Sequence, residues 1–156
     1  MPDSAYKQIL DNVKTQIVAL ELSGVTSTNV VLMKMATMRN KEVAALPAVL
    51  ISPFGQPRTI TNTPADTVGT NVLQYPVAIM VIQDGNQDHT GNYDRISLWL
   101  QNIFQEFYHK GISAVTAGNV YSCEVDHRDT FQPDAWFDNL DVGGMVLRFN
   151  CQLARS

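Results

Sequence analysis

The sequence has few of the residues from which catalytic, metal-binding or membrane-spanning sites are built. Its 156 residues include three histidines and two cysteines. No apolar run approaches the roughly 20 residues that a membrane-spanning helix needs. No basic N-terminal flank precedes an apolar segment, as it does in a secretory signal. These absences predict a soluble protein that is made in a reducing cytoplasm and has no membrane partner.

The sequence also lacks a concentration of positive charge. Charged residues make up 17% of the chain, the formal net charge is −4, and the lysines and arginines are dispersed. Neutralised phosphates dominate the affinity of proteins for duplex DNA, so this balance argues against a specifically bound nucleic acid. The length fits a single domain with its own hydrophobic core.

The segment DGNQDHTGNYDR, residues 84–95, invites comparison with a calcium-binding EF-hand loop. Its first, third and fifth positions carry the expected oxygen ligands, which are Asp84, Asn86 and Asp88. The sixth position needs glycine for a sharp turn but holds His89, and the twelfth needs a bidentate glutamate but holds Arg95. The segment is therefore predicted to be a loop before a helix that Asn92 or Asp94 caps.

No other group of residues has the spacing of a catalytic or metal site. Asp126 and His127 point to opposite sides of a predicted strand. His89 and His109 lie about 30 Å apart at opposite ends of a predicted helix. The sequence contains no Gly-x-Ser-x-Gly nucleophile elbow, phosphate-binding P-loop or Gly-x-Gly-x-x-Gly motif. We therefore expect no enzymatic activity, no cofactor and no metal.

Two segments have the apolar spacing of amphipathic helices. The first begins after the capping residue Ser4 and is expected to run to about Ser23, before Gly24. The second, residues 94–110, has the stronger pattern. Its broad apolar face consists of Ile96, Trp99, Leu100, Ile103, Phe104, Phe107 and Tyr108. A stripe of this kind is a surface for core packing rather than a cofactor site.

The remaining apolar segments are short, as strands are. They are residues 30–36, 47–53, 77–82, 120–127 and 145–153. Segment 77–82 is apolar on both faces, which indicates a central strand. The last two segments alternate, with Tyr121, Cys123, Val125, Met145, Leu147, Phe149, Cys151 and Leu153 expected to face the core. The two cysteines are interpreted as buried free thiols, with a disulfide between neighbouring strands as the alternative.

This order of elements predicts one α+β domain over residues 1–156. Its sheet is expected to be mostly antiparallel, with an N-terminal helix and a long central helix packed on one face. Residues 54–71 are predicted to be a protruding polar loop or hairpin, and residues 143–144 a turn or bulge. The aromatic residues of segment 131–137 form either a lid over the sheet edge or part of a subunit interface.

The layout of the chain from residue 5 to residue 153 resembles a known group of proteins. After the N-terminal helix come PAVLISP, YPVAIMVIQDGN, DRISLWLQNIFQEF, VYSCEVDHRDTF and LDVGGMVLRFNCQ. This element order and hydrophobic pattern resemble the neck and tail-completion proteins of tailed bacteriophages, the head–tail connector and tail-terminator group. The resemblance implies a homo-oligomeric ring, often of six subunits, that contacts tail-tube or head-connector proteins.

The resemblance also implies a location in the virion, after assembly in the cytoplasm of the bacterial host, and no catalytic residues. Genomic DNA would pass through the ring without specific binding, which suits an acidic chain because a negative lumen repels phosphate. We predict that the subunit contacts include Arg58, Ile60, Arg148, Asn150 and Gln152. The alternative is a small-ligand-binding or enzymatic α+β domain with a pocket between helix 94–110 and the sheet.

Overall fold

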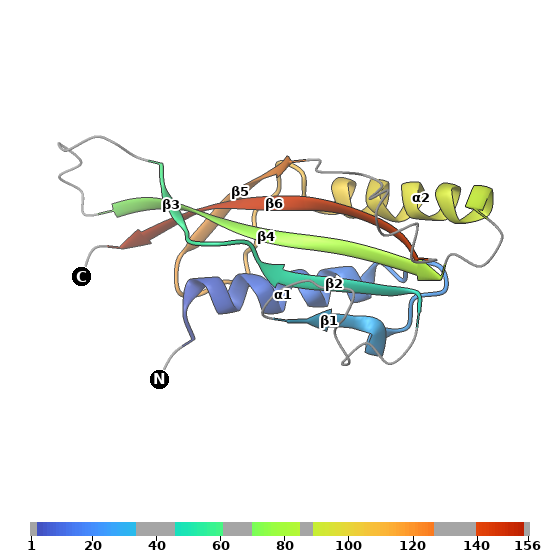
Figure 1. The fold of residues 1–156 in the computed structure, drawn as a ribbon. Coiled ribbons are helices and arrows are strands. Elements are labelled where there is room, and N and C mark those ends of the chain that lie inside the picture. Colours follow the sequence, from blue (N-terminus) through green and yellow to red (C-terminus); the bar gives the residue numbers. More distant parts are fainter. Residues whose placement is uncertain (1–2, 34–45, 61–69, 85–88, 127–139, 155–156) are drawn as a thin grey trace.

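The computed structural model describes residues 3–33, 46–60, 70–84, 89–126 and 140–154 (Figure 1). In chain order, its elements are α1 (Ala5–Ala19), the 3-10 helix η1 (Ser27–Asn29), β1 (Val30–Leu32), β2 (Ala48–Pro53), β3 (Arg58–Thr59), β4 (Thr70–Asp84), α2 (His89–Phe107), β5 (Asn119–Asp126) and β6 (Leu140–Ala154). The strands form one six-stranded sheet in the order β1-β2-β4-β6-β5, and β3 also pairs with β4. The prediction of an α+β fold is confirmed.

The sheet is mixed, because its first two strands run parallel. Val30 of β1 lies opposite Val49 of β2 in the parallel register, whereas the other neighbouring strands are antiparallel. Two parallel strands that follow each other in the chain need a connection of about a dozen residues or more, and segment 33–47 has this length. Apolar periodicity does not report strand direction, so the sequence prediction lacks this pair. Of the predicted strand 30–36, residues 34–36 lie outside the described residues.

Helix α1 is shorter than its apolar spacing predicts. The Ser4 hydroxyl accepts a backbone hydrogen bond from the first turn at 3.2 Å, as an N-cap does. The helix ends at Ala19 rather than Ser23, because Glu21 already adopts a left-handed φ of 49° before Gly24 does so at 81°. The buried residues of the helix are Ala5, Ile9, Val13 and Ile17.

Strands β4 and β6 are the longest strands and form the centre of the sheet. They pair antiparallel along their full length of 15 residues. They therefore extend well beyond the predicted segments 77–82 and 145–153. The prediction of a turn or bulge at residues 143–144 is wrong, because these glycines lie within β6 opposite Val81 and Met80. Pairing with the long neighbouring strand overrides the weak strand preference of glycine.

Helix α2 begins earlier than the predicted segment 94–110. It starts at His89, so Asn92 and Asp94 lie inside the helix and neither caps it. That prediction is wrong because apolar packing of the later turns overrides the poor helix propensity of the first turn. The helical conformation from His89 onward is also incompatible with an EF-hand loop over residues 84–95.

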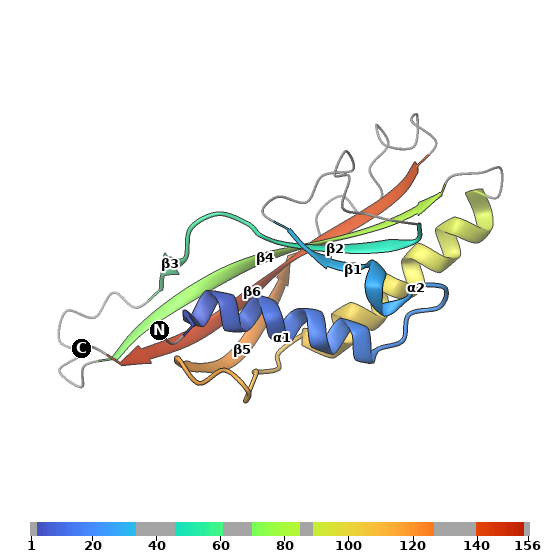
Figure 2. The same ribbon diagram turned by 90° about the horizontal axis from the view of Figure 1, so that it is seen from below.

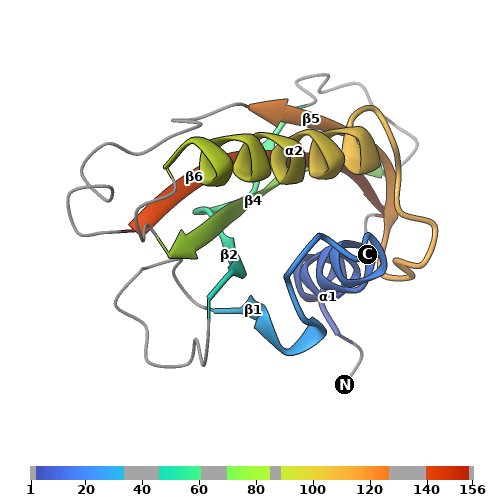
Figure 3. The same cartoon turned by 90° about the vertical axis from the view of Figure 1, so that its right-hand side faces the viewer.

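Both helices pack on the same side of the sheet (Figures 2 and 3). Their apolar ridges and alternate residues of the central strands form one core cluster, which includes Ile9, Val13, Ile17, Tyr75, Val77, Ile79, Ile96, Trp99, Ile103, Phe107, Met145, Leu147, Phe149 and Cys151. The predicted role of the α2 stripe as a core surface is confirmed for its residues from Ile96 to Phe107. It is wrong for Tyr108, which is 41% exposed and lies beyond the end of the helix at Phe107. Cys123 and Cys151 are free and buried, as expected for small apolar residues of a core.

Strand β5 carries a bulge that changes which residues face the core. Its register with β6 shifts between Val120 and Ser122. As a result Val120 is 3% exposed, whereas Tyr121 is 44% exposed. The prediction that Tyr121 faces the core is wrong, since strict alternation cannot anticipate an extra residue in one strand.

The chain that follows α2 covers part of the outer edge of β5. His109 N donates a hydrogen bond to Cys123 O at 2.9 Å, and Ile112 N donates one to Val120 O at 3.0 Å. Gly111 lies between these contacts, and a Cβ at this position would collide with the carbonyl oxygen of Val120. The edge of β5 is therefore closed to strand addition as far as Cys123.

Candidate contact surface

The side of the sheet that faces away from α1 and α2, here called the helix-free face, carries a continuous row of polar residues. Directly opposed residues of neighbouring strands point to the same side of a sheet. The register places Arg58 of β3 opposite Gln74, Gln74 opposite Asn150, and Asn150 opposite Ser122 of β5. These four residues, here called the polar row, cross three strand spacings, or about 14 Å.

Hydrogen bonds between side chains hold the middle of the polar row together. Asn150 Nδ2 donates to Ser122 Oγ at 2.9 Å, and Gln74 Nε2 donates to Asn150 Oδ1 at 3.1 Å. Gln74 Nε2 also lies 3.2 Å from Glu124 Oε2, so the network reaches a carboxylate on β5. Each amide in the row is thereby fixed in one orientation.

The burial of the polar row falls from its middle to its ends. Gln74 is 8% exposed and Asn150 is 7% exposed, whereas Arg58 at one end is exposed and Ser122 at the other is half-buried. Glu124, two residues after Ser122 on β5, is exposed. Asn150 faces outward, as the alternation in β6 predicts, but it is buried because its amide is engaged by neighbours on both sides. The row thus has a hydrogen-bonded middle, with accessible, oppositely charged residues near its two ends.

A second charged pair lies beside the polar row. Arg148 is directly opposite Glu124 in the β5–β6 register, and its guanidinium lies 3.6 Å from Asp126 Oδ2. Both side chains of this ion pair are partly exposed, so the pair itself adds little stability. Its position extends the polar character of the helix-free face along β5 and β6.

The sheet extends beyond the helices at the end where β3 lies (Figures 1 and 2). Ile60 follows β3 and donates its backbone N–H to Val72 O at 3.0 Å, so pairing with β4 continues past Thr59. The Ile60 side chain is 36% exposed. Gln152 of β6 lies opposite Val72 and is exposed too.

The structure brings the five predicted contact residues together on the helix-free face. The register of β3, β4 and β6 places Arg58, Ile60, Arg148, Asn150 and Gln152 on this one side of the sheet. Sequence alternation alone relates only the last three. Long-range pairing through β4 brings the first two beside them.

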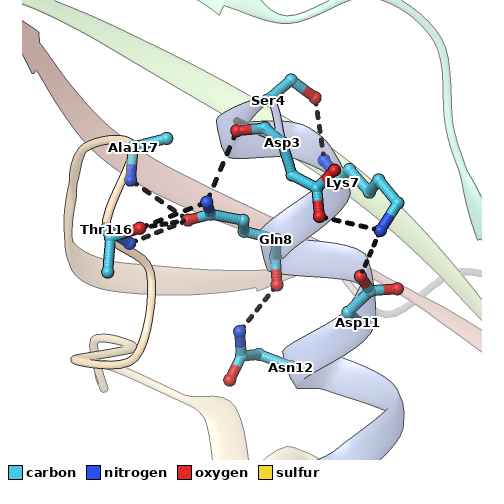
Figure 4. Close-up of polar contacts among 8 residues, drawn as sticks. All are labelled: Asp3, Ser4, Lys7, Gln8, Asp11, Asn12, Thr116 and Ala117. Atoms are coloured by element: carbon cyan, nitrogen blue, oxygen red, sulfur yellow. Dashed lines mark hydrogen bonds and ion pairs between the residues drawn. The ribbon is translucent and has the colours of Figure 1, made fainter. Parts of the chain in front are cut away.

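Sequence reasoning missed Gln8, which joins α1 to the connection between α2 and β5 (Figure 4). Gln8 Oε1 accepts hydrogen bonds from Thr116 N at 2.8 Å and from Ala117 N at 3.1 Å. The next residue, Gly118, is so closely packed that a Cβ there would lie 2.7 Å from Cys151 Sγ. A polar residue at the start of an amphipathic helix gives no sequence signal of such a role.

Lys7 lies on the outer side of the same helix (Figure 4). Its Nζ is 2.9 Å from Asp11 Oδ2 and 3.0 Å from Asp3 Oδ2. Hydrogen bonds to Asp11 and Asp3 raise the pKa of Lys7. The ammonium group therefore stays charged, and these contacts are surface ion pairs rather than a site of proton transfer.

The two thiols are placed for packing and not for nucleophilic chemistry. Burial raises the pKa of Cys123 to about 12, and burial also raises the pKa of Cys151. A thiol reacts as its thiolate, so both groups are inert near neutral pH.

In the ranges that the structure describes, no group of three or more His, Cys, Asp or Glu residues is arranged to hold a metal ion. His127 and the aromatic segment 131–137 lie outside those ranges. No helix among the described residues is both long and apolar enough to cross a membrane.

The space between α2 and the sheet is filled with apolar side chains. Trp99 and Ile103 of α2 are 0% exposed, and Phe107 is 1% exposed. The rings of Phe107 and Phe149 meet edge to face, with centroids 5.9 Å apart. These residues occupy the place where the alternative interpretation puts a ligand pocket.

Comparisons with known proteins give weak structural likeness. No protein-family model matches the sequence, and no curated protein matches it. Among solved structures, a chain of the virion of a native gene transfer agent (GTA) particle is similar over 96% of this chain and 92% of its own. The sequence identity is 11% and the TM-score is 0.45. A likeness at this level does not by itself establish a shared fold or function.

Proposed function

We propose that this protein is a structural subunit of a tailed-phage virion. Copies of it would join into a homo-oligomeric ring at the head–tail junction, as a tail terminator or neck subunit, and the ring would have no catalytic activity. Its place in the virion is proposed from the sequence resemblance to tail-completion proteins. Its self-assembly is proposed from the contact surface described above.

The observation that carries the proposal is the composition of the helix-free face. The side chains of Arg58, Ile60, Arg148, Asn150 and Gln152 share this face, where Asn150 belongs to a buried hydrogen-bonded network. Gln74 and Asn150 are themselves buried, so the exposed residues Arg58, Ile60 and Gln152 would supply the contact. The network holds together the strands that carry them, which lowers the entropy lost when a partner binds. A contact between two different patches that closes by rotation generates a ring.

The proposed partners follow from the same arrangement. The ring would contact tail-tube or head-connector proteins with the surfaces not used between subunits. Genomic DNA would pass through its lumen without specific binding, since a chain with a net charge of −4 offers no excess of cations to hold phosphate. Exposed apolar residues at the protruding end of the sheet, such as Ile60, supply area for either kind of protein contact.

Native mass spectrometry of the purified protein tests the ring. We expect an assembly with the mass of several 17.3 kDa chains, with six as the stoichiometry that the resemblance suggests. Negative-stain electron microscopy of the same sample should show closed rings. A protein that stays monomeric across the micromolar range would refute the proposal.

A further inference from the structure

We propose that neighbouring copies of this chain join head to tail through the strands at the two ends of the polar row, with Arg58 on β3 of one copy against Glu124 on β5 of the next. This inference rests on the proposed ring and names the contact that would close it. Arg58 is on β3 at one edge of the sheet, and Glu124 is on β5 at the other.

The two charges are complementary and accessible. Arg58 and Glu124 are both exposed, and neither belongs to an ion pair within the described part of the chain. Glu124 Oε2 accepts a hydrogen bond from Gln74 Nε2 at 3.2 Å. Gln74 is on β4, so this bond draws the carboxylate inward over β6 without neutralising it. Opposite charges carried by strands at opposite edges favour contact between two copies in the same orientation.

The pairing of Arg58 with Glu124 sets the symmetry of the contact. In a two-fold dimer formed through either edge, a patch meets its own copy, so the patch that holds Arg58 and the patch that holds Glu124 do not meet each other. Such a dimer would leave the Arg58–Glu124 charge pair unformed. A head-to-tail contact pairs unlike charges at every interface, and such contacts form closed rings when the rotation permits.

The covered edge of β5 indicates how the contact is made. Backbone hydrogen bonds from His109 and Ile112 occupy this edge as far as Cys123, and Glu124 is the next residue. Strand addition is therefore blocked on β5 up to Cys123, and a neighbouring copy that meets this covered part contacts side chains. Each end of the row also has an exposed apolar residue nearby, Ile60 at 36% and Tyr121 at 44% exposure, which can exclude water around the ion pair.

Charge reversal tests this contact in the full-length protein. We expect R58E and E124R each to raise the apparent dissociation constant of the assembly by about tenfold or more, because each places like charges together. The double variant R58E/E124R should restore most of the wild-type affinity. K14E carries the same charge change on α1, which packs on the other side of the sheet, and should leave assembly unchanged. E124Q keeps a hydrogen-bond acceptor for Gln74 and should weaken assembly less than E124R.

Sedimentation equilibrium at two salt concentrations provides the measurement, with circular dichroism to verify that each variant is folded. Wild-type assembly should weaken as salt rises. Unchanged assembly of folded R58E and E124R would overturn this contact but leave the ring standing. Failure of the double variant to recover, while both single variants are impaired, would overturn the pairing of these two residues. A monomeric wild-type protein would overturn the ring and this contact together.

Discussion

Replacement of Phe149 by alanine tests whether the interface between α2 and the sheet is a filled core. Phe149 is 0% exposed, and its ring meets that of Phe107 at an interplanar angle of 87°. A buried phenyl ring removes on the order of 200 Å² from water, which corresponds to about 5 kcal/mol at about 25 cal/mol per Å². Alanine retains the Cβ, so we expect a loss of about 3–5 kcal/mol in the free energy of unfolding.

Urea unfolding monitored by circular dichroism measures this loss. A thermal scan should show a fall in Tm of about 2–4 °C for each kcal/mol lost. Leu98, on the outer side of α2, is 50% exposed, and Leu98→Ala is a matched control that should change stability by at most about 0.5 kcal/mol. If Phe149→Ala costs less than about 1 kcal/mol, the ring borders open space, and the pocket that the alternative function requires regains support.

Three further variants probe the contacts around β5. Gln8→Ala removes the acceptor for Thr116 N and Ala117 N and should lower the free energy of unfolding in urea by about 1–2 kcal/mol. An unchanged urea midpoint would show that this contact is weak in solution. Gly118→Ala places a Cβ 2.7 Å from Cys151 Sγ and should lower Tm; equal Tm values would contradict the close packing. Burial raises the pKa of Cys123 from 9.0 to about 12. The thiol therefore ionises at a lower pH in the unfolded chain than in the folded protein, and the folded state loses stability as the pH rises from 9.0 toward about 12. The free energy of unfolding of Cys123→Ala should lack this pH dependence. If the free energies of unfolding of Cys123→Ala and of wild type differ by a constant amount from pH 8 to about pH 10, the raised pKa of Cys123 is refuted.

The two edges of the sheet are unlike each other. The β5 edge is covered by the chain after α2 as far as Cys123, and the opposite side of β4 is shared between β2 and the short strand β3. The two edges therefore differ in length, cover and charge. A subunit with two unlike edges is suited to head-to-tail assembly, in which each edge meets the other and not itself.

The predicted contact residues show where sequence reasoning stops. Alternation in β6 places Arg148, Asn150 and Gln152 on one face, because successive side chains of a strand point to opposite sides. Alternation does not reveal that Arg58 and Ile60 join them, since that depends on the pairing of β3 with β4 and of β4 with β6. It also does not reveal that Asn150 is buried, because its burial comes from neighbours on other strands.

The sequence by itself determined the kinds of elements, the apolar faces of both helices and the core position of the two cysteines, whereas the structure decided that they are free thiols. These features follow from local periodicity and residue type, which operate over a few neighbouring positions. Tertiary structure alone decided the parallel β1–β2 pair, the full length of β4 and β6, and the bulge at Tyr121. Strand direction, length and register depend on which distant segment supplies the hydrogen-bond partners, and a one-residue change of register turns every side chain to the other face.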